Sequence, residues 1–259
     1  MAKGEESRRL DWAERWVRSG LELSRPPAFF ETLQADMSES RALVERARRH
    51  GVRVTYAAIL VRAAALALEA NPDLHVVVCG GRVHSPAQVD IAVSVAAEGA
   101  LAPVMVLEGA NLKKLPEVAA ELAGRVEAVQ KADARTMESL RKRGWAAPFG
   151  GMRKAVLRGL YRSPAFRRKS AGTFQVSIVP AVDQFITPVF GGTAVLTAGR
   201  VAERAVAENG AAVVRPTVHL ACCADHRVWN GAAAGTFLRA VQEVLEGAAL
   251  GAELPITND

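Results

Sequence analysis

The run from Ala57 to Ala70 is apolar on all sides of a helix and is interrupted at Arg62. It is shorter than the roughly 18 uninterrupted apolar residues that a membrane span needs, so we interpret it as a buried helix. The chain has 259 residues, half of them hydrophobic, which suits one large α/β domain or two small ones. We expect a single domain over residues 1–259.

Other helical patterns alternate with short runs rich in β-branched residues. No regular βαβ period connects them, so we predict an α/β fold, of the two-layer α+β kind, with a mixed β-sheet flanked by helices. Asn209-Gly210 predicts a hairpin turn between the last two strands. The predicted strands are 29–37, 75–79, 89–96, 101–107, 173–179, 193–199, 200–208 and 211–223, and the predicted helices are 8–20, 38–50, 55–69, 114–131 and 232–245.

A strongly basic segment separates the helix predicted to end near residue 131 from the strand predicted to begin near 173. Residues 135–169 hold eleven basic residues and one acid, Glu138, a local charge of +10 in a chain of total charge +6, so the remainder carries −4. We interpret this segment as an insertion, at about 135–170, that contains an amphipathic helix. Its predicted apolar face is formed by Met152, Val156, Leu157, Leu160 and Tyr161, with Arg153, Lys154, Arg158 and Arg162 on the other sides.

Four interpretations of this helix stay open. It lies on an anionic membrane surface, contacts an acidic partner, shields a phosphate-bearing ligand, or is an ordinary solvated surface helix. Nucleic-acid binding is disfavoured because the aromatic residues, 5% of the chain, are too few for a stacking platform and no recognition motif occurs.

Several common kinds of site are absent from the sequence. There is no phosphate-binding glycine loop and no G-x-S-x-G nucleophile motif. The five histidines show no metal-ligand spacing, and the three cysteines, Cys79, Cys222 and Cys223, form no C-x-x-C pair, so we expect no metal. An odd number of cysteines favours a reducing, cytoplasmic location.

His226 is the strongest candidate for chemistry. It follows the strand predicted at 211–223 and stands between Asp225 and Arg227. An imidazole titrates near neutral pH, so a histidine at a strand end is a candidate general base. Ser177, by contrast, is on residue pattern alone an ordinary strand hydroxyl.

Several motifs, in the same order along the chain, resemble the catalytic domain of dihydrolipoamide acyltransferases, the core subunits of 2-oxo acid dehydrogenase complexes. The sequence 225–232, D-H-R-x-x-N-G-A, resembles the family signature D-H-R-x-x-D-G-A, and 172–177, G-T-F-Q-V-S, resembles G-T-F-T-I-S. The segments 27–36, 89–104 and 187–201 are also similar, so the resemblance covers about residues 8–250. The wider superfamily includes chloramphenicol acetyltransferase, whose fold is therefore expected here.

The resemblance implies a mechanism. His226 would be the general base that deprotonates a thiol of coenzyme A or dihydrolipoyl, Ser177 would donate a hydrogen bond to the tetrahedral oxyanion, and Asn230 would have a supporting role. Acyl-coenzyme A is implied as a substrate, with no specific residues assigned to its binding. A homotrimer is implied, with the histidine and the serine of each site on different chains.

The sequence also departs from the family pattern. Asn230 replaces the family aspartate and removes its charge. We expect no lipoyl or subunit-binding domain, so a lipoyl group would come from another protein, such as a lipoyl- or acyl-carrier protein. The polar end of the C-terminal segment 251–259 favours an isolated trimer over a larger cage. The alternative function is a weakly active or inactive trimeric scaffold or partner subunit of a dehydrogenase complex.

Overall fold

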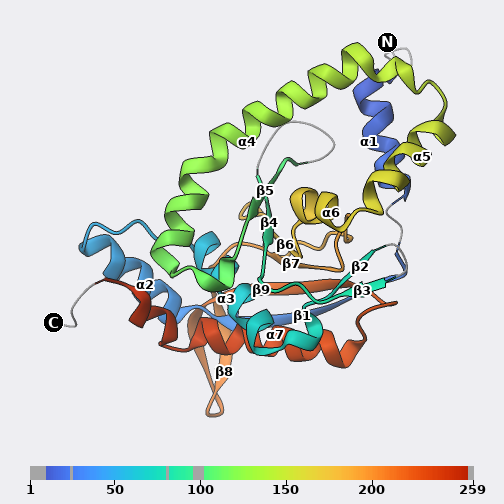
Figure 1. Cartoon of the computed structure of the whole chain (residues 1–259). Coiled ribbons are helices and arrows are strands. Elements are labelled where there is room, and N and C mark those ends of the chain that lie inside the picture. Colours follow the sequence, from blue (N-terminus) through green and yellow to red (C-terminus); the bar gives the residue numbers. More distant parts are fainter. Residues whose placement is uncertain (1–9, 24–25, 80–81, 96–101, 256–259) are drawn as a thin grey trace, which may run out of the picture.

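A mixed β-sheet of seven strands forms the centre of the protein (Figure 1). The computed structural model describes residues 10–23, 26–79, 82–95 and 102–255. The strand order is β1-β9-β7-β6-β4-β5, with β8 paired to β9 beyond this path. The pairs β4–β6 and β6–β7 are parallel and the others antiparallel, which confirms the predicted mixed sheet. The strands are β1 (Ala28–Asp36), β4 (Ile91–Ser94), β5 (Val104–Leu107), β6 (Phe174–Ile178), β7 (Ala194–Ala198), β8 (Ala202–Glu208) and β9 (Ala211–Asp225).

Seven α-helices and a small hairpin surround this sheet in the described part of the chain (Figure 1). The hairpin pairs β2 (Val77–Cys79) with β3 (Arg82–His84), and its predicted turn at 80–81 lies outside the described residues. So does the C-terminal end, 256–259, on which the expectation of an isolated trimer depends. The helices are α1 (Trp12–Leu23), α2 (Ser38–Arg49), α3 (Tyr56–Ala70), α4 (Leu115–Arg143), α5 (Gly150–Tyr161), α6 (Pro164–Ala171) and α7 (Gly231–Glu246).

The core lies between one face of the sheet and helices α3 and α7. Ten of the fifteen residues of α3 are buried, as expected for a helix without a polar face. Its N-terminus is capped by Thr55, whose hydroxyl accepts a hydrogen bond from Ala58 N at 3.2 Å. Phe174 of β6 packs between Trp229 and Phe237, with ring centroids 6.2 and 4.9 Å apart. This packing holds α7 and the turn before it against the sheet.

Arg62, the residue that interrupts the apolar run, is buried at 7% exposure. Its guanidinium forms an ion pair with Glu253 at 2.6 Å and donates to the carbonyls of Ala110 and Asn111. A buried charge is tolerated when it is paired and hydrogen-bonded. Arg62 therefore connects α3 to the C-terminal turn at 249–253.

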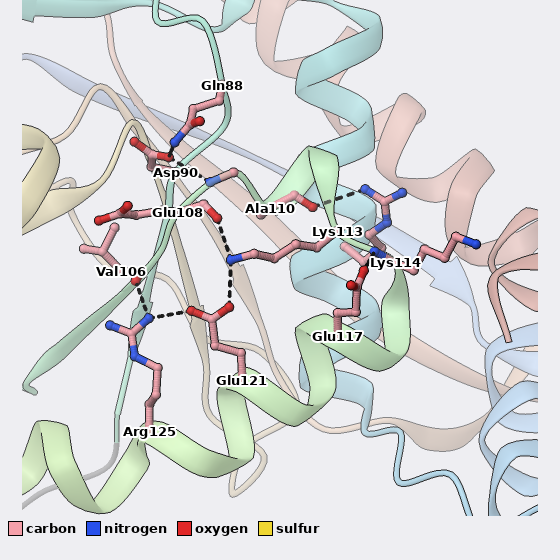
Figure 2. Close-up of polar contacts among 12 residues, drawn as sticks. Gln88, Asp90, Val106, Glu108, Ala110, Lys113, Lys114, Glu117, Glu121 and Arg125 are labelled. Atoms are coloured by element: carbon pink, nitrogen blue, oxygen red, sulfur yellow. Dashed lines mark hydrogen bonds and ion pairs between the residues drawn. The ribbon is translucent and has the colours of Figure 1, made fainter. Parts of the chain in front are cut away.

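Helix α4 ends twelve residues beyond the predicted helix end near residue 131. Its buried residues all lie in the first half. Arg125 ties this half to β5 by donating to Val106 O at 2.9 Å, and Glu121 pairs with Arg125 at 2.6 Å and with Lys113 at 2.7 Å (Figure 2). Beyond Leu122 none of its residues is buried. Apolar spacing therefore could not predict the second half of the helix. Ion pairs between residues four apart stabilise this half, such as Lys142–Glu138 at 3.1 Å.

The basic segment 135–169 forms the end of α4 and all of α5, together with part of α6, rather than one amphipathic helix. Leu157 and Tyr161 are half-buried, whereas Met152, Val156 and Leu160 are exposed. The predicted single apolar face is thus wrong, because these residues divide between the inner and outer sides of α5.

The other predicted elements agree with the structure to within a few residues at each described end; the predicted ends at residues 8, 96 and 101 lie outside the described residues. The hairpin turn between β8 and β9 is confirmed at Asn209 and Gly210, whose φ angles of 51° and 79° are the left-handed values that a tight hairpin requires. Among the described helices, none is both long and apolar enough to cross a membrane.

Candidate active site

His226 stands where β9 ends, and the local backbone fixes its position. Its N–H donates to Pro27 O at 2.8 Å, and its ring packs on Phe29 of β1 with centroids 4.8 Å apart. The turn after it is closed by Val228 N and Trp229 N, which both donate to Asp225 O. His226 is nevertheless exposed, so its imidazole is held in place and open to a ligand or another chain.

The carboxylate of Asp225 is occupied by Arg227. The two side chains form an ion pair at 2.6 Å, and Asp225 also accepts from Arg227 N at 3.0 Å. Burial of Asp225 acts to raise the pKa of its carboxyl, but the hydrogen bonds and charge of Arg227 outweigh that effect and hold the pKa below its ordinary value. Asp225 therefore stays ionised and orders the turn, and its carboxylate is directed to Arg227.

Asn230 caps the helix that follows. Its Oδ1 accepts a hydrogen bond from Ala233 N at 2.9 Å, which satisfies one of the free N–H groups at the start of α7. The described residues give it no hydrogen bond to His226. Asn230, which the sequence predicts to support the histidine, thus stabilises the start of α7 in this chain.

Ser177 lies in β6 on the sheet face away from α3 and α7. The neighbouring Val176 belongs to the core under those helices, and successive strand residues point to opposite faces. Ser177 pairs in register with Thr197 of β7, which pairs with Ala221 of β9. Its side chain is buried at 8% exposure, and no described residue forms a hydrogen bond with its hydroxyl. Sequence reasoning did not identify Thr197 as its neighbour.

One chain does not bring Ser177 and His226 together. Ser177 and His226 lie two strands apart in the sheet, which is about 10 Å across the strands. Ala221 of β9 lies in register with Ser177, and His226 follows it by five residues, which is about 17 Å along the strand. The two positions are thus separated by about 20 Å. A hydrogen-bonded reaction centre needs contacts of about 3 Å, so this chain alone cannot complete the proposed pair.

A cavity of about 680 Å³ opens beside the His226 turn. Asp225, Arg227 and Val228 form one wall, and Arg158 and Tyr161 of α5 form part of another. Burial raises the pKa of the Tyr161 hydroxyl. The cavity lies between the sheet and the basic segment, and its arginines are the described side chains best suited to an anionic group of a ligand.

A second buried polar cluster escaped sequence reasoning. His75 Nε2 lies 2.7 Å from Thr173 Oγ1, which accepts from Asp90 N at 2.9 Å, and the Asp90 carboxylate pairs with Arg168 of α6 at 2.7 Å. Asp90 also accepts from Gly109 N at 2.9 Å (Figure 2). The sequence places His75 only at the start of the strand predicted at 75–79. The cluster joins β4, β6 and α6, and nothing in the spacing of these residues indicates it.

No group of three His, Cys, Asp or Glu side chains that could hold a metal occurs among the residues with described positions. Cys222 and Cys223 are free and buried, and burial raises the pKa of both thiols.

Comparison with protein families gives a match to the 2-oxoacid dehydrogenases acyltransferase (catalytic domain) over residues 10–140 and 169–251. The unmatched residues between these ranges include α5. A curated relative is the dihydrolipoyllysine-residue succinyltransferase component of the 2-oxoglutarate dehydrogenase complex of Azotobacter vinelandii. It is 27% identical over 241 residues, which is 90% of this chain and 52% of the relative. The chain therefore spans about half the length of that relative.

Solved structures give the same fold. A structure of A. vinelandii dihydrolipoamide acetyltransferase, from an investigation of the roles of a serine, a histidine and an asparagine in its catalytic mechanism, matches with a TM-score of 0.72 at 21% identity, over 95% of this chain and 93% of that one. The cubic core of a pyruvate dehydrogenase multienzyme complex matches with a TM-score of 0.68 at 22% identity, over 95% and 93%. Chloramphenicol acetyltransferase matches with a TM-score of 0.50 at 16% identity, over 90% and 94%.

Proposed function

Because the chain belongs to the family of 2-oxoacid dehydrogenase acyltransferase catalytic domains, we propose that it transfers an acyl group between coenzyme A and a thiol acceptor of the dihydrolipoyl type. The observation that carries this proposal is the exposed imidazole of His226 at the end of β9, which packs on Phe29 while the backbone N–H of His226 donates to Pro27 O. Residues 10–255 act in this proposal as one catalytic domain.

The reaction follows from the chemistry of a thiol and a thioester. A free thiol has a pKa of about 8.5, so at neutral pH a base must remove its proton before the sulfur becomes a strong nucleophile. His226 takes that proton, and the sulfur attacks the thioester carbonyl to form a tetrahedral oxyanion. The intermediate collapses by breaking the original carbon–sulfur bond, and the imidazolium returns its proton to the departing thiolate.

Ser177 supplies the hydrogen bond to the oxyanion. Its buried hydroxyl lies in a strand of the rigid sheet, which suits a donor that must be positioned before charge develops. Since about 20 Å separates it from His226 in one chain, each site combines His226 of one copy with Ser177 of another. A head-to-tail contact of this kind closes into a ring, and we propose a homotrimer.

Asn230 supports the site by fixing the start of α7 four residues after the base. In our proposal the chain is active although Asn230 lacks the charge of the family aspartate. The A. vinelandii acetyltransferase supports this view, because an asparagine was studied for a catalytic role in that enzyme and lies four positions after the histidine studied with it.

The relatives named above are components of multienzyme complexes, and this is the reason for proposing a protein partner. We propose that a lipoyl- or acyl-carrier protein presents its thiol at the site, while acyl-coenzyme A is the second substrate. The buried free thiols of Cys222 and Cys223 are compatible with a cytoplasmic location.

Transfer from acetyl-coenzyme A to free dihydrolipoamide tests the proposal. Free coenzyme A and acetyl-dihydrolipoamide are measured by chromatography, because the reaction consumes one thiol for each thiol that it releases. We expect His226→Ala to lower kcat by about 10²–10⁴-fold, because it removes the base. His50→Ala is the matched control, since His50 is exposed at the end of α2. Turnover that His226→Ala leaves unchanged would contradict the proposal. Folded protein that neither turns over nor binds coenzyme A in calorimetry would favour the scaffold function.

A further inference from the structure

Helix α5 buries one of its arginines and exposes part of its apolar surface, although Leu157 and Tyr161 are half-buried. Arg153 points inward and is buried at 8% exposure. Met152, Val156 and Leu160 form a stripe on the outer side, at 39%, 45% and 42% exposure. Residues four apart lie on one face of a helix, so the three side chains are contiguous. A surface helix normally presents polar side chains to water, so this stripe is suited to a less polar environment.

Specific contacts fix this orientation. The guanidinium of Arg153 donates to Ala147 O at 2.9 Å, Pro148 O at 2.8 Å and Ser19 Oγ at 3.1 Å. Lys154 pairs with Glu22 of α1 at 2.6 Å. Both contacts hold the inner side of α5 against α1 and the preceding turn. Rotating the helix to bury the stripe would break them, so the outward direction of the apolar side chains is built into the fold.

Two aromatic residues extend the stripe toward α4. Trp145 and Phe149 are 64% and 73% exposed. The backbone at Gly144 is packed so closely on α1 that an added Cβ would lie 2.9 Å from Trp12 Cβ, and Gly144 O accepts from Trp16 Nε1 at 3.3 Å. This close contact fixes the short turn that carries Trp145 outward.

The segment that carries the stripe is basic. From Ser139 to Val182 the sequence contains ten Lys and Arg residues and no Asp or Glu. Arg141, Lys142 and Lys154 pair with acidic side chains, whereas Arg143, exposed at the end of α4, forms no ion pair with any described residue. An apolar surface with Trp and Phe, carried by a segment of net positive charge, matches the interface of a membrane whose headgroups are anionic.

We propose that α5 and the turn before it dock the protein onto an anionic lipid bilayer, with the docking surface formed by Trp145, Phe149, Met152, Val156 and Leu160. The apolar side chains enter the headgroup region and the basic side chains pair with lipid phosphates. A second copy that placed the same surface against it would bring like charges together, and the light-scattering measurement below detects any other contact between copies. An acidic protein would pair with the arginines but leave the apolar stripe without a specific partner. The family match does not include α5, so this surface is additional to the transferase fold.

Vesicle flotation tests the proposal with phosphatidylcholine vesicles and with vesicles that also contain phosphatidylglycerol. We expect the full chain to float only with the anionic vesicles, less so at high salt, because counterions screen the basic residues. The triple variant Met152→Gln, Val156→Gln, Leu160→Gln should bind at least about tenfold more weakly, because its apolar area no longer enters the bilayer. A triple variant, Leu112→Gln, Val126→Gln and Val214→Gln, is the matched control, since these side chains are exposed on other elements, at 71%, 37% and 68%.

Fluorescence gives an independent measurement. Anionic vesicles should shift the tryptophan emission of the wild type to shorter wavelength, and Trp145→Phe should remove the shift while leaving flotation intact. The proposal is overturned if the wild type does not float with anionic vesicles, or if the triple variant floats as well as the control. It is also overturned if the triple variant loses the oligomeric mass of the wild type in light scattering, because copies of the chain would then cover the surface.

Discussion

Helices α3 and α5 each have one buried arginine, yet they direct their apolar side chains in different ways. In α3 most apolar side chains are buried in the protein, and Arg62 is neutralised by Glu253. In α5 an apolar stripe is exposed, while Arg153 is held by Ser19 and two carbonyl oxygens. The first helix completes the core below the sheet, and the second presents a surface. A buried arginine therefore does not imply that the rest of its helix is buried.

The largest expected difference between the two helices concerns their arginines. Glu253→Ala leaves Arg62 buried without its counter-charge and should lower the free energy of unfolding by about 3–5 kcal/mol. Ser19→Ala removes one neutral partner of Arg153 and should cost about 1–3 kcal/mol. Urea unfolding followed by circular dichroism measures both. A smaller loss for Glu253→Ala than for Ser19→Ala would remove the distinction between the two arginines.

The apolar side chains of the two helices should differ next. Ile59→Ala in α3 creates a cavity in the core and should cost about 2–5 kcal/mol. Leu160→Ala in α5 removes an exposed side chain and should change the free energy of unfolding by less than about 0.5 kcal/mol. The same urea experiment applies. Equal losses at the two positions would show that the α5 stripe is packed within the folded chain.

The N-terminal caps of the helices provide a third contrast. Asn230 caps α7 with its side chain, and Thr55 caps α3 in the same way. The N-cap residue of α5 is Phe149, which provides no side-chain hydrogen bond. Asn230→Ala should cost about 1 kcal/mol, and Asn230→Asp should retain stability because aspartate caps equally well. Thermal unfolding of the two variants beside the wild type measures this. A stability loss in Asn230→Asp as large as that in Asn230→Ala would argue against capping as the role of the side chain.

The smallest expected effect lies at the boundary between the core and the basic segment. Burial lowers the pKa of His75, Asp90 opposes this, and Arg168 adds to it. Because the folded state binds the proton less readily than the unfolded chain, the stabilising contribution is complete above about pH 6.5 and decreases as the pH falls below it. His75→Gln should reduce this pH dependence of the free energy of unfolding. The same dependence of the free energy of unfolding on pH in the variant and the wild type would contradict this role of His75.

Sequence reasoning described the elements around the candidate site more accurately than the basic segment. The strand predicted at 211–223 and the Asn209-Gly210 turn depend on local patterns, and both lie where they were predicted. The second half of α4 and the outward face of α5 were missed, because apolar periodicity shows which residues share a face but not which side is covered. The His75–Thr173–Asp90 cluster joins residues up to 98 positions apart, so local spacing could not reveal it.

The separation of Ser177 from His226 is the central claim, and complementation between two inactive variants tests it most directly. His226→Ala and Ser177→Ala are each expected to be severely impaired, the latter by about 10²–10³-fold in kcat. When the two are co-expressed, random mixing places an intact His226 opposite an intact Ser177 of a neighbouring copy at about one quarter of the sites. The account predicts recovery of about one quarter of wild-type acetyl transfer to dihydrolipoamide. Mixed oligomers no more active than the single variants would contradict it.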